Sequence, residues 1–180
     1  KRSTRRFIRY SCTWNTKPAR PKKNNRKMFD ELTNYYRSLA AANKHIGSFV
    51  GMDVNEFTSY AGEGAIQYPC LCMETMTGVL SATRSDNENT AAAGGFAVLC
   101  AVDEGDYPAE TKALQTAFDI AVQIFARMKR DRDEMRIPEL LEIDIDNVSW
   151  ETLGPVGPDN AFGILFKIKT FHPVDLYFNP

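Results

Sequence analysis

Apolar residues recur at every third or fourth position in two parts of the chain, which predicts two amphipathic helices. The first covers about 28–46 and meets no strong helix breaker before Gly47. The second begins after Asp106, a suitable N-cap residue, and has Pro108 in its first turn. Its stripe consists of Leu114, Ala117, Phe118, Ala121, Ile124, Phe125 and Met128. We expect this helix to pack on a sheet and to end in a solvated, charged turn at 129–134.

Short apolar runs and alternating positions predict strands between the helices. Residues 95–102 are almost continuously apolar, as in a central strand that is covered on both faces. Residues 66–73 also look like a strand, although Pro69 favours an edge or a bulge there. We expect a short strand or turn at 49–57 and a further extended segment at 76–84.

The last part of the chain predicts a long β-hairpin. A half-exposed strand begins at 141 and continues to Trp150, and turn-forming residues at 153–160 suit the tip. The returning strand, 162–168, alternates apolar residues with lysine. Because most connections are short, the sequence predicts an α+β fold in a single domain, 28–180. We expect a mainly antiparallel sheet of about four to six strands, two main helices packed on one face, and a closing β-hairpin.

Charge is divided unevenly along the chain. Residues 1–27 hold eleven of the 22 Lys and Arg residues and no Asp or Glu. The rest of the chain holds the other eleven and all 23 acidic residues, so its formal net charge is −12. The overall value of −1 therefore conceals a basic N-terminal extension and an acidic domain.

The extension, 1–27, lacks a sustained helical or strand period, so we expect an arm without its own core. Met28 follows it directly, which leaves a leader, upstream translation or a cloning artefact as one interpretation. A natural arm would contact protein, or it would bind nucleic acid by neutralising phosphates and stacking aromatic rings on bases. The residues expected to make such contacts are Arg5, Arg6, Arg9, Trp14, Lys22 and Lys23.

Sequence patterns of common catalytic and cofactor sites are missing. There is no GxxxxGK[ST], no GxGxxG after a strand and no GxSxG. His45 and His172 lie far apart in sequence, and His172 suits a hairpin end better than a general base. We therefore expect no enzymatic activity, metal or cofactor, and no apolar run is long enough for a membrane span. The cysteines are expected to be buried free thiols in a reducing compartment: Cys12, Cys70, Cys72 and Cys100.

Two groups of carboxylates remain as candidate interaction sites. One lies at 103–106, and the other is the row Glu142, Asp144 and Asp146. This row lines one strand face, where like charges repel one another unless cations meet them. It is interpreted either as a solvated face or as the docking surface for a basic neighbour or for the chain's own arm. A calcium site is a further interpretation, although the usual ligand-rich loop is missing.

The order of the elements and the closing hairpin, VSWETLGPVGPDNAFGILFKIKTFHP, resemble those of small uncharacterised proteins of prophages and other mobile elements. In architecture, residues 28–178 resemble the tail-terminator, or tail-completion, proteins of tailed phages. The resemblance implies a non-enzymatic, ring-forming protein that joins edge to edge and contacts other phage structural proteins at the tail or the head–tail joint. It also implies assembly in the cytoplasm and a place in the virion. It transfers no functional residue, because no catalytic motif defines that family.

Two other classes of function stay open at this point. The first is a nucleic-acid-binding protein that uses the basic arm. The second is a small-ligand or enzymatic domain, which predicts a deep pocket with convergent polar groups near 103–107 or His172.

Overall fold

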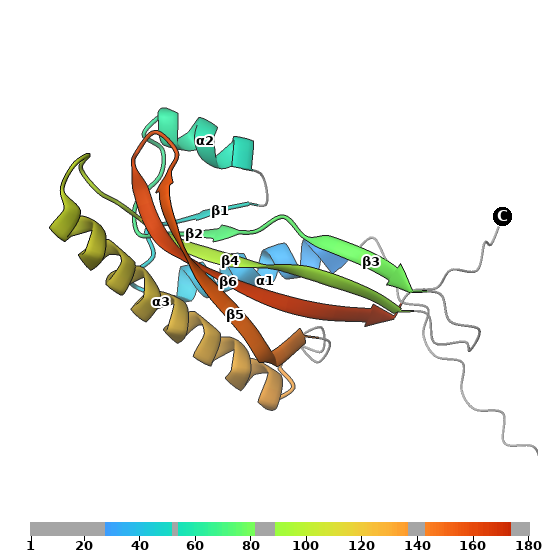
Figure 1. The fold of residues 1–180 in the computed structure, drawn as a ribbon. Helices are drawn as coiled ribbons and strands as arrows, with labels where there is room; N and C mark the ends of the chain where they lie inside the picture. Colours follow the sequence, from blue (N-terminus) through green and yellow to red (C-terminus); the bar gives the residue numbers. More distant parts are fainter. Residues whose placement is uncertain (1–27, 52–53, 82–88, 137–142, 174–180) are drawn as a thin grey trace, which may run out of the picture.

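The computed structural model of the protein describes residues 28–51, 54–81, 89–136 and 143–173. Helices and strands in these ranges form one sheet with helices on both faces (Figure 1). Their order along the chain is α1 (Met28–Ala42), β1 (Ser48–Val50), α2 (Val54–Gly62), β2 (Cys70–Met73), β3 (Thr77–Ser81), β4 (Asn89–Ala101), α3 (Tyr107–Asp133), β5 (Ile143–Val156) and β6 (Ala161–Pro173).

The sheet is mixed and mostly antiparallel. Its strands follow the order β1-β2-β4-β6-β5, and β3 pairs with β4 outside this path. Only β1 and β2 run parallel among the strands described. The long strands β4 and β6 pair from Asn89↔Pro173 to Ala101↔Ala161, and they form the middle of the sheet. The sequence prediction of an α+β fold with a largely antiparallel sheet and a closing hairpin is confirmed.

The main core lies between the sheet and the two longer helices, α1 and α3. Phe96 of β4 and Phe166 of β6 stack with ring centroids 5.4 Å apart, and Tyr36 of α1 meets Phe96 at 5.9 Å. From α3, Phe125 contacts the Phe166 ring at 6.0 Å. These aromatic contacts fix both helices on the same face of the sheet, as the sequence predicts.

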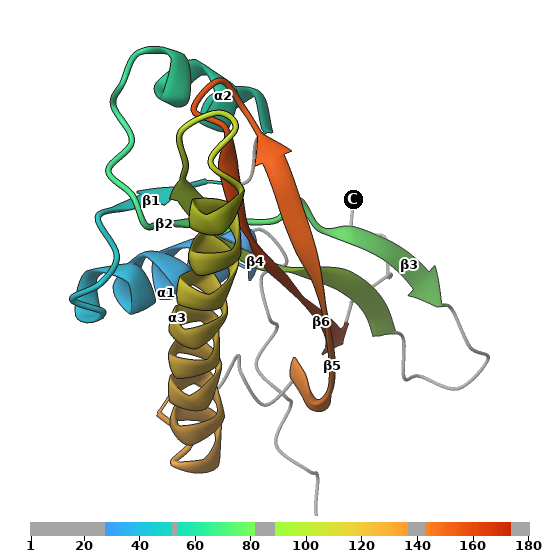
Figure 2. The same ribbon diagram turned by 60° about the vertical axis from the view of Figure 1, so that its left-hand side comes forward.

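The opposite face is covered in part by α2, a helix that sequence analysis did not predict. In Figure 2, α2 lies beyond one end of α3 and on the other side of the sheet. Phe57 and Ala61 of α2 are buried against Leu99 of β4 and Leu165 of β6. The segment that was expected to be a short strand or turn, 49–57, therefore contains the end of β1 and the start of α2.

Pro69 does not place its strand at the edge of the sheet, so that expectation is wrong. The proline directly precedes β2, and the ladder hydrogen bonds begin with Cys70. A proline before the first paired residue removes no donor from the ladder. As a result β2 lies inside the sheet, between β1 and β4.

The start of α3 agrees with the sequence prediction, whereas its end does not. The Asp106 carboxylate accepts a hydrogen bond from the Ala109 backbone N–H at 3.1 Å, as an N-cap does. The charged segment 129–134 is not a solvated turn, because the helix continues to Asp133 and buries Asp131. The hairpin tip is also shorter than expected, since β5 continues to Val156.

Candidate functional site

Apolar side chains are exposed along one flank of the molecule, where α3 lies beside β5. Trp150 of β5 is 54% exposed although its ring packs edge-on against Phe118 of α3 at 5.3 Å. One helical turn along α3, Val122 is 42% exposed. Residues 118 and 122 share a helix face, and Trp150 is paired with buried Phe166, so the three side chains gather on the same side of the sheet.

The strand beneath these side chains is an edge strand. Among the described strands, β5 pairs only with β6. An edge strand offers free backbone N–H and C=O groups along one side, which makes it suitable for pairing with another chain. The ladder is irregular between Asp144 and Ser149 and again between Leu153 and Val156.

Of the acidic row in the sequence analysis, Asp146 lies on this flank. Asp144 is paired with Lys169, whose neighbour Ile168 is buried under the helices, so Asp144 faces the other side of the sheet. Glu142 lies outside the described residues. Asp144 is half-buried and accepts hydrogen bonds from the Asn147 side chain at 3.0 and 3.2 Å. The Asp146 side chain is 79% exposed and lies 3.8 Å from the guanidinium of Arg132. We call Phe118, Val122, Asp146 and Trp150 together the β5 flank.

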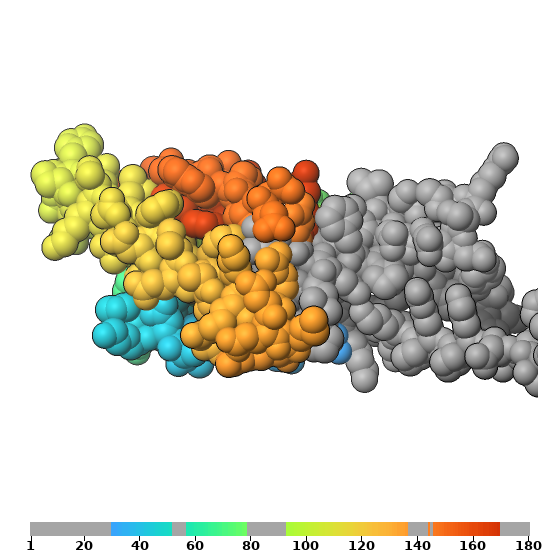
Figure 3. All heavy atoms as spheres, turned by 90° about the horizontal axis from the view of Figure 1, so that it is seen from below, coloured from blue at the N-terminus to red at the C-terminus, as the bar shows by residue number. Residues whose placement is uncertain are grey.

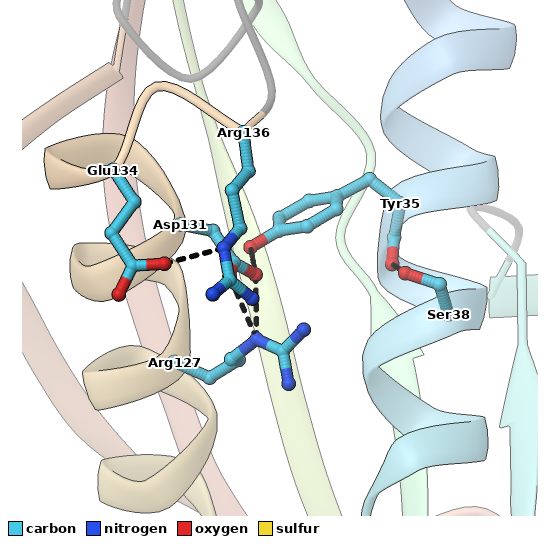
Figure 4. Close-up of polar contacts among 6 residues, drawn as sticks. All are labelled: Tyr35, Ser38, Arg127, Asp131, Glu134 and Arg136. Atoms are coloured by element: carbon cyan, nitrogen blue, oxygen red, sulfur yellow. Dashed lines mark hydrogen bonds and ion pairs between the residues drawn. The ribbon is translucent and has the colours of Figure 1, made fainter.

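A cluster of polar side chains joins α1 to α3, on the side of α3 that faces away from β5. The hydroxyl of Tyr35 donates a hydrogen bond to the buried carboxylate of Asp131 at 3.2 Å (Figure 4). Arg127, one turn earlier on α3, donates from Nε to both oxygens of Asp131 at 2.7 and 2.8 Å. Arg136 lies 3.9 Å from the same carboxylate and also forms an ion pair with Glu134.

Burial and the neighbouring negative charge govern the chemistry of Tyr35. Burial is the largest cause that raises the pKa of the Tyr35 phenol, followed by the charge of Asp131 and the hydrogen bond to it. The phenol therefore stays protonated at physiological pH and acts as a hydrogen-bond donor. This arrangement satisfies a buried carboxylate, so we interpret it as a structural contact between helices.

Next to this contact, basic side chains surround a groove of about 340 Å³ between the end of α1 and α3. Its rim carries four basic residues, and its apolar part is formed by Leu39, Ala42 and Ile124. We call the rim residues the basic groove: Lys44, His45, Arg127 and Arg130. In Figure 3, α3 runs in yellow to orange between the cyan segment that holds the end of α1 and the orange-red hairpin of β5 and β6. The basic groove and the β5 flank thus lie on opposite sides of α3.

A more apolar cavity of about 320 Å³ lies on the opposite face of the sheet, beside α2. Phe57, Leu99 and Leu165 line it, and Glu74 and Cys72 are among its polar residues. Burial raises the pKa of the Glu74 carboxyl above its usual value of 4.5, while Lys167 opposes that shift and Glu151 adds to it. A protonatable group beside apolar walls suits a small apolar molecule with one polar end.

The described cysteines are free thiols, two of them buried: Cys70, Cys72 and Cys100. The contact with Cys72, 3.7 Å between sulfur atoms, raises the pKa of Cys70, and burial raises it further. Burial also raises the pKa of Cys100 to about 11. Thiols with raised pKa values stay protonated at neutral pH, so they are poor nucleophiles and poor metal ligands.

The remaining predicted positions have different outcomes. The arm residues lie outside the described part of the chain, as does Cys12: Arg5, Arg6, Arg9, Trp14, Lys22 and Lys23. The two cavities described above are not lined by residues 103–107, and Asp106 there caps α3. His172 belongs to β6, where its backbone is paired with Thr90.

The described residues contain neither a cluster of metal-ligating side chains nor a membrane-spanning helix. No three His, Cys, Asp or Glu side chains within these ranges gather closely enough to hold a metal ion. None of the helices in the same ranges is long and apolar enough to span a membrane.

Sequence analysis missed the basic groove and the apolar cavity. The groove combines residues of α1 with residues some eighty positions later in α3, and no local period reports such a meeting. The sequence did contain one signal of a basic surface. Arg127 and Arg130 are three positions apart, just before the buried Asp131, and therefore lie on one face of α3. The cavity depends on α2, which was itself not predicted.

Comparisons with known proteins give no family for this chain. No protein-family model matches the sequence. A search of curated proteins likewise found no matching relative. The function therefore has to be argued from the sites themselves.

Proposed function

We propose that this protein is a non-enzymatic structural protein that assembles with further copies of itself, and that it serves as a tail-terminator or head–tail joining protein of a tailed phage or prophage-like element. The observation that carries self-association is the half-exposed Trp150 on β5, which pairs only with β6 among the described strands. The phage assignment rests on the order of elements and the closing hairpin.

Physical reasons support an interface at this place. Tryptophan is enriched among residues that contribute most of the binding energy at protein interfaces. Trp150 and Val122 form an apolar surface that water covers in the single chain, and covering it by a second chain is favourable by roughly 25 cal/mol per Å². The edge of β5 adds backbone groups that can pair with a second chain.

A substitution at the centre of this surface tests the proposal. We expect Trp150→Ser to shift the sedimenting species of the full chain towards the monomer, because it removes the largest exposed apolar side chain of the flank. Tyr107→Ser is the matched control, since Tyr107 is 73% exposed but lies at the start of α3. Equal sedimentation of both variants and the wild type would contradict the interface.

A second candidate function is the binding of a small apolar molecule, which the cavity beside α2 favours. If Glu74 receives the polar end, hexylammonium should raise the melting temperature more than hexanoate does, and Glu74→Gln should remove the difference. No stabilisation by either probe at millimolar concentration would rule this candidate out.

A further inference from the structure

Two surfaces of opposite charge lie on opposite sides of α3. The basic groove carries Lys44 and Arg130, and among the described residues neither of them forms an ion pair with a carboxylate. The β5 flank carries Asp146, whose side chain is 79% exposed and whose one described ion pair is the long contact to Arg132. Within the part of the chain that the structure describes, both surfaces therefore present charge that is poorly compensated.

The apolar parts of the two surfaces are complementary as well. The groove has an apolar part formed by Leu39, Ala42 and Ile124 under a rim that includes arginine. The β5 flank presents the half-exposed ring of Trp150. Arginine binds favourably over the face of tryptophan, so an indole in the groove would gain both apolar contact and cation–π attraction.

We infer that the β5 flank of one copy binds in the basic groove of a second copy, with Trp150 entering the groove and Asp146 facing Lys44 and Arg130. This inference rests on the proposed self-association and specifies its contact. Because the two surfaces differ and lie on opposite sides of α3, each copy uses both, which makes the contact head-to-tail. Such a contact closes into a ring when the rotation between copies allows it.

A charge exchange between two variants tests this contact. Variant one carries Lys44→Glu and Arg130→Glu in the groove, and variant two carries Asp146→Lys on the flank. Each variant alone places like charges at every contact, so we expect its self-association to weaken roughly tenfold or more. In a one-to-one mixture the reversed groove of variant one can bind the reversed flank of variant two. The native groove of variant two can likewise bind the native flank of variant one. The two variants should therefore alternate in the mixture and form larger assemblies again, which sedimentation velocity detects.

Matched controls and milder variants keep the test decisive. Ser59→Glu in α2 and Glu63→Lys directly after this helix change exposed positions on the other face of the sheet, and both should leave assembly unchanged. If circular dichroism shows that variant one is misfolded, the single change Lys44→Glu replaces it in the exchange with Asp146→Lys.

The outcomes separate this inference from the proposed function. The head-to-tail contact is supported if each variant fails to assemble by itself and the mixture of the two assembles. If the wild type and both variants assemble equally well, or if the mixture stays as small as its parts, the contact is wrong while self-association stands. A wild type that remains monomeric at every concentration overturns both.

Discussion

The contact between Tyr35 and Asp131 joins two residues that are 96 positions apart in sequence. Asp131 lies within a run of charged residues, and such runs usually mark a solvated surface, which is why sequence analysis placed it in a turn. Its carboxylate is buried because the Tyr35 hydroxyl and the Arg127 guanidinium satisfy it. A partner from another helix cannot be inferred from the local pattern of one helix.

Removing the hydroxyl of Tyr35 should destabilise the fold. The change Tyr35→Phe keeps the ring but deletes a hydrogen bond to a buried charged group, and the expected loss is about 2 kcal/mol of unfolding free energy. Urea unfolding measures this loss. Tyr60→Phe is the control, because Tyr60 is 42% exposed, and we expect its effect to stay within about 0.5 kcal/mol. Equal stabilities of the two variants would contradict the structural role given to Asp131.

The Glu74 carboxyl predicts a specific dependence of stability on pH. Because burial raises the pKa of Glu74 in the folded state, the unfolded chain loses this proton first as pH rises. The unfolding free energy contributed by Glu74 therefore falls from about pH 4.5 up to the folded pKa and stays low above it. Glu74→Gln should remove this fall and stabilise the protein at neutral pH. Urea unfolding at several values between pH 4 and pH 8 measures the unfolding free energy of the wild type and of Glu74→Gln. The same pH dependence in both proteins would contradict the raised pKa of Glu74, and Glu63→Gln is the exposed control.

At the scale of the element, hydrophobic periodicity predicted those helices and strands that bury one face along their length. The stripe of α3 and the alternation of β6 were recovered, because each of these elements buries one continuous face against the core. Helix α2 was missed because, of its six residues whose burial the structure describes, Phe57 and Ala61 alone are buried, too few to form a period. The strand β2 was found, but its place in the sheet depends on pairing partners that a single segment does not specify.

The middle of the sheet depends on glycine where β4 and β6 approach each other. A Cβ atom at Gly163 would lie 1.9 Å from the backbone oxygen of Val98, which is far inside contact distance. We therefore expect Gly163→Ala to force the strands apart and to cost about 3 kcal/mol or more of unfolding free energy.

Gly62→Ala is the matched control for this substitution. Gly62 ends α2, and a Cβ atom there would meet nothing within 4 Å. Alanine at this position should be neutral or slightly stabilising, because it restricts the unfolded chain. Thermal unfolding of the two variants checks both expectations, and similar melting temperatures would contradict the close approach of β4 and β6.

At the scale of the molecule, positive charge is concentrated in two places, the basic groove of the domain and the arm, 1–27. The acidic domain contains a basic groove that composition alone conceals, because four basic side chains meet there in a part of the chain with a net charge of −12. The basic arm, 1–27, lies outside the described residues, so its role stays a prediction.

The arm can be tested separately from the domain. If it binds nucleic acid, the full chain should bind duplex DNA with an affinity that falls steeply as salt rises, and deletion of 1–27 should abolish binding. Fluorescence anisotropy at 50 and 200 mM salt measures this. An absence of binding at low salt would contradict a nucleic-acid role, and residual binding after the deletion would point to the basic groove.

Self-association through a head-to-tail contact is the central claim about the whole molecule. It is tested most directly by sedimentation velocity of the wild-type chain over a wide range of protein concentration, at low and at high salt. The account predicts an oligomer of discrete mass that dissociates as salt rises, because its contact pairs the basic groove with the acidic β5 flank. A single species of monomer mass at every concentration and salt would contradict it.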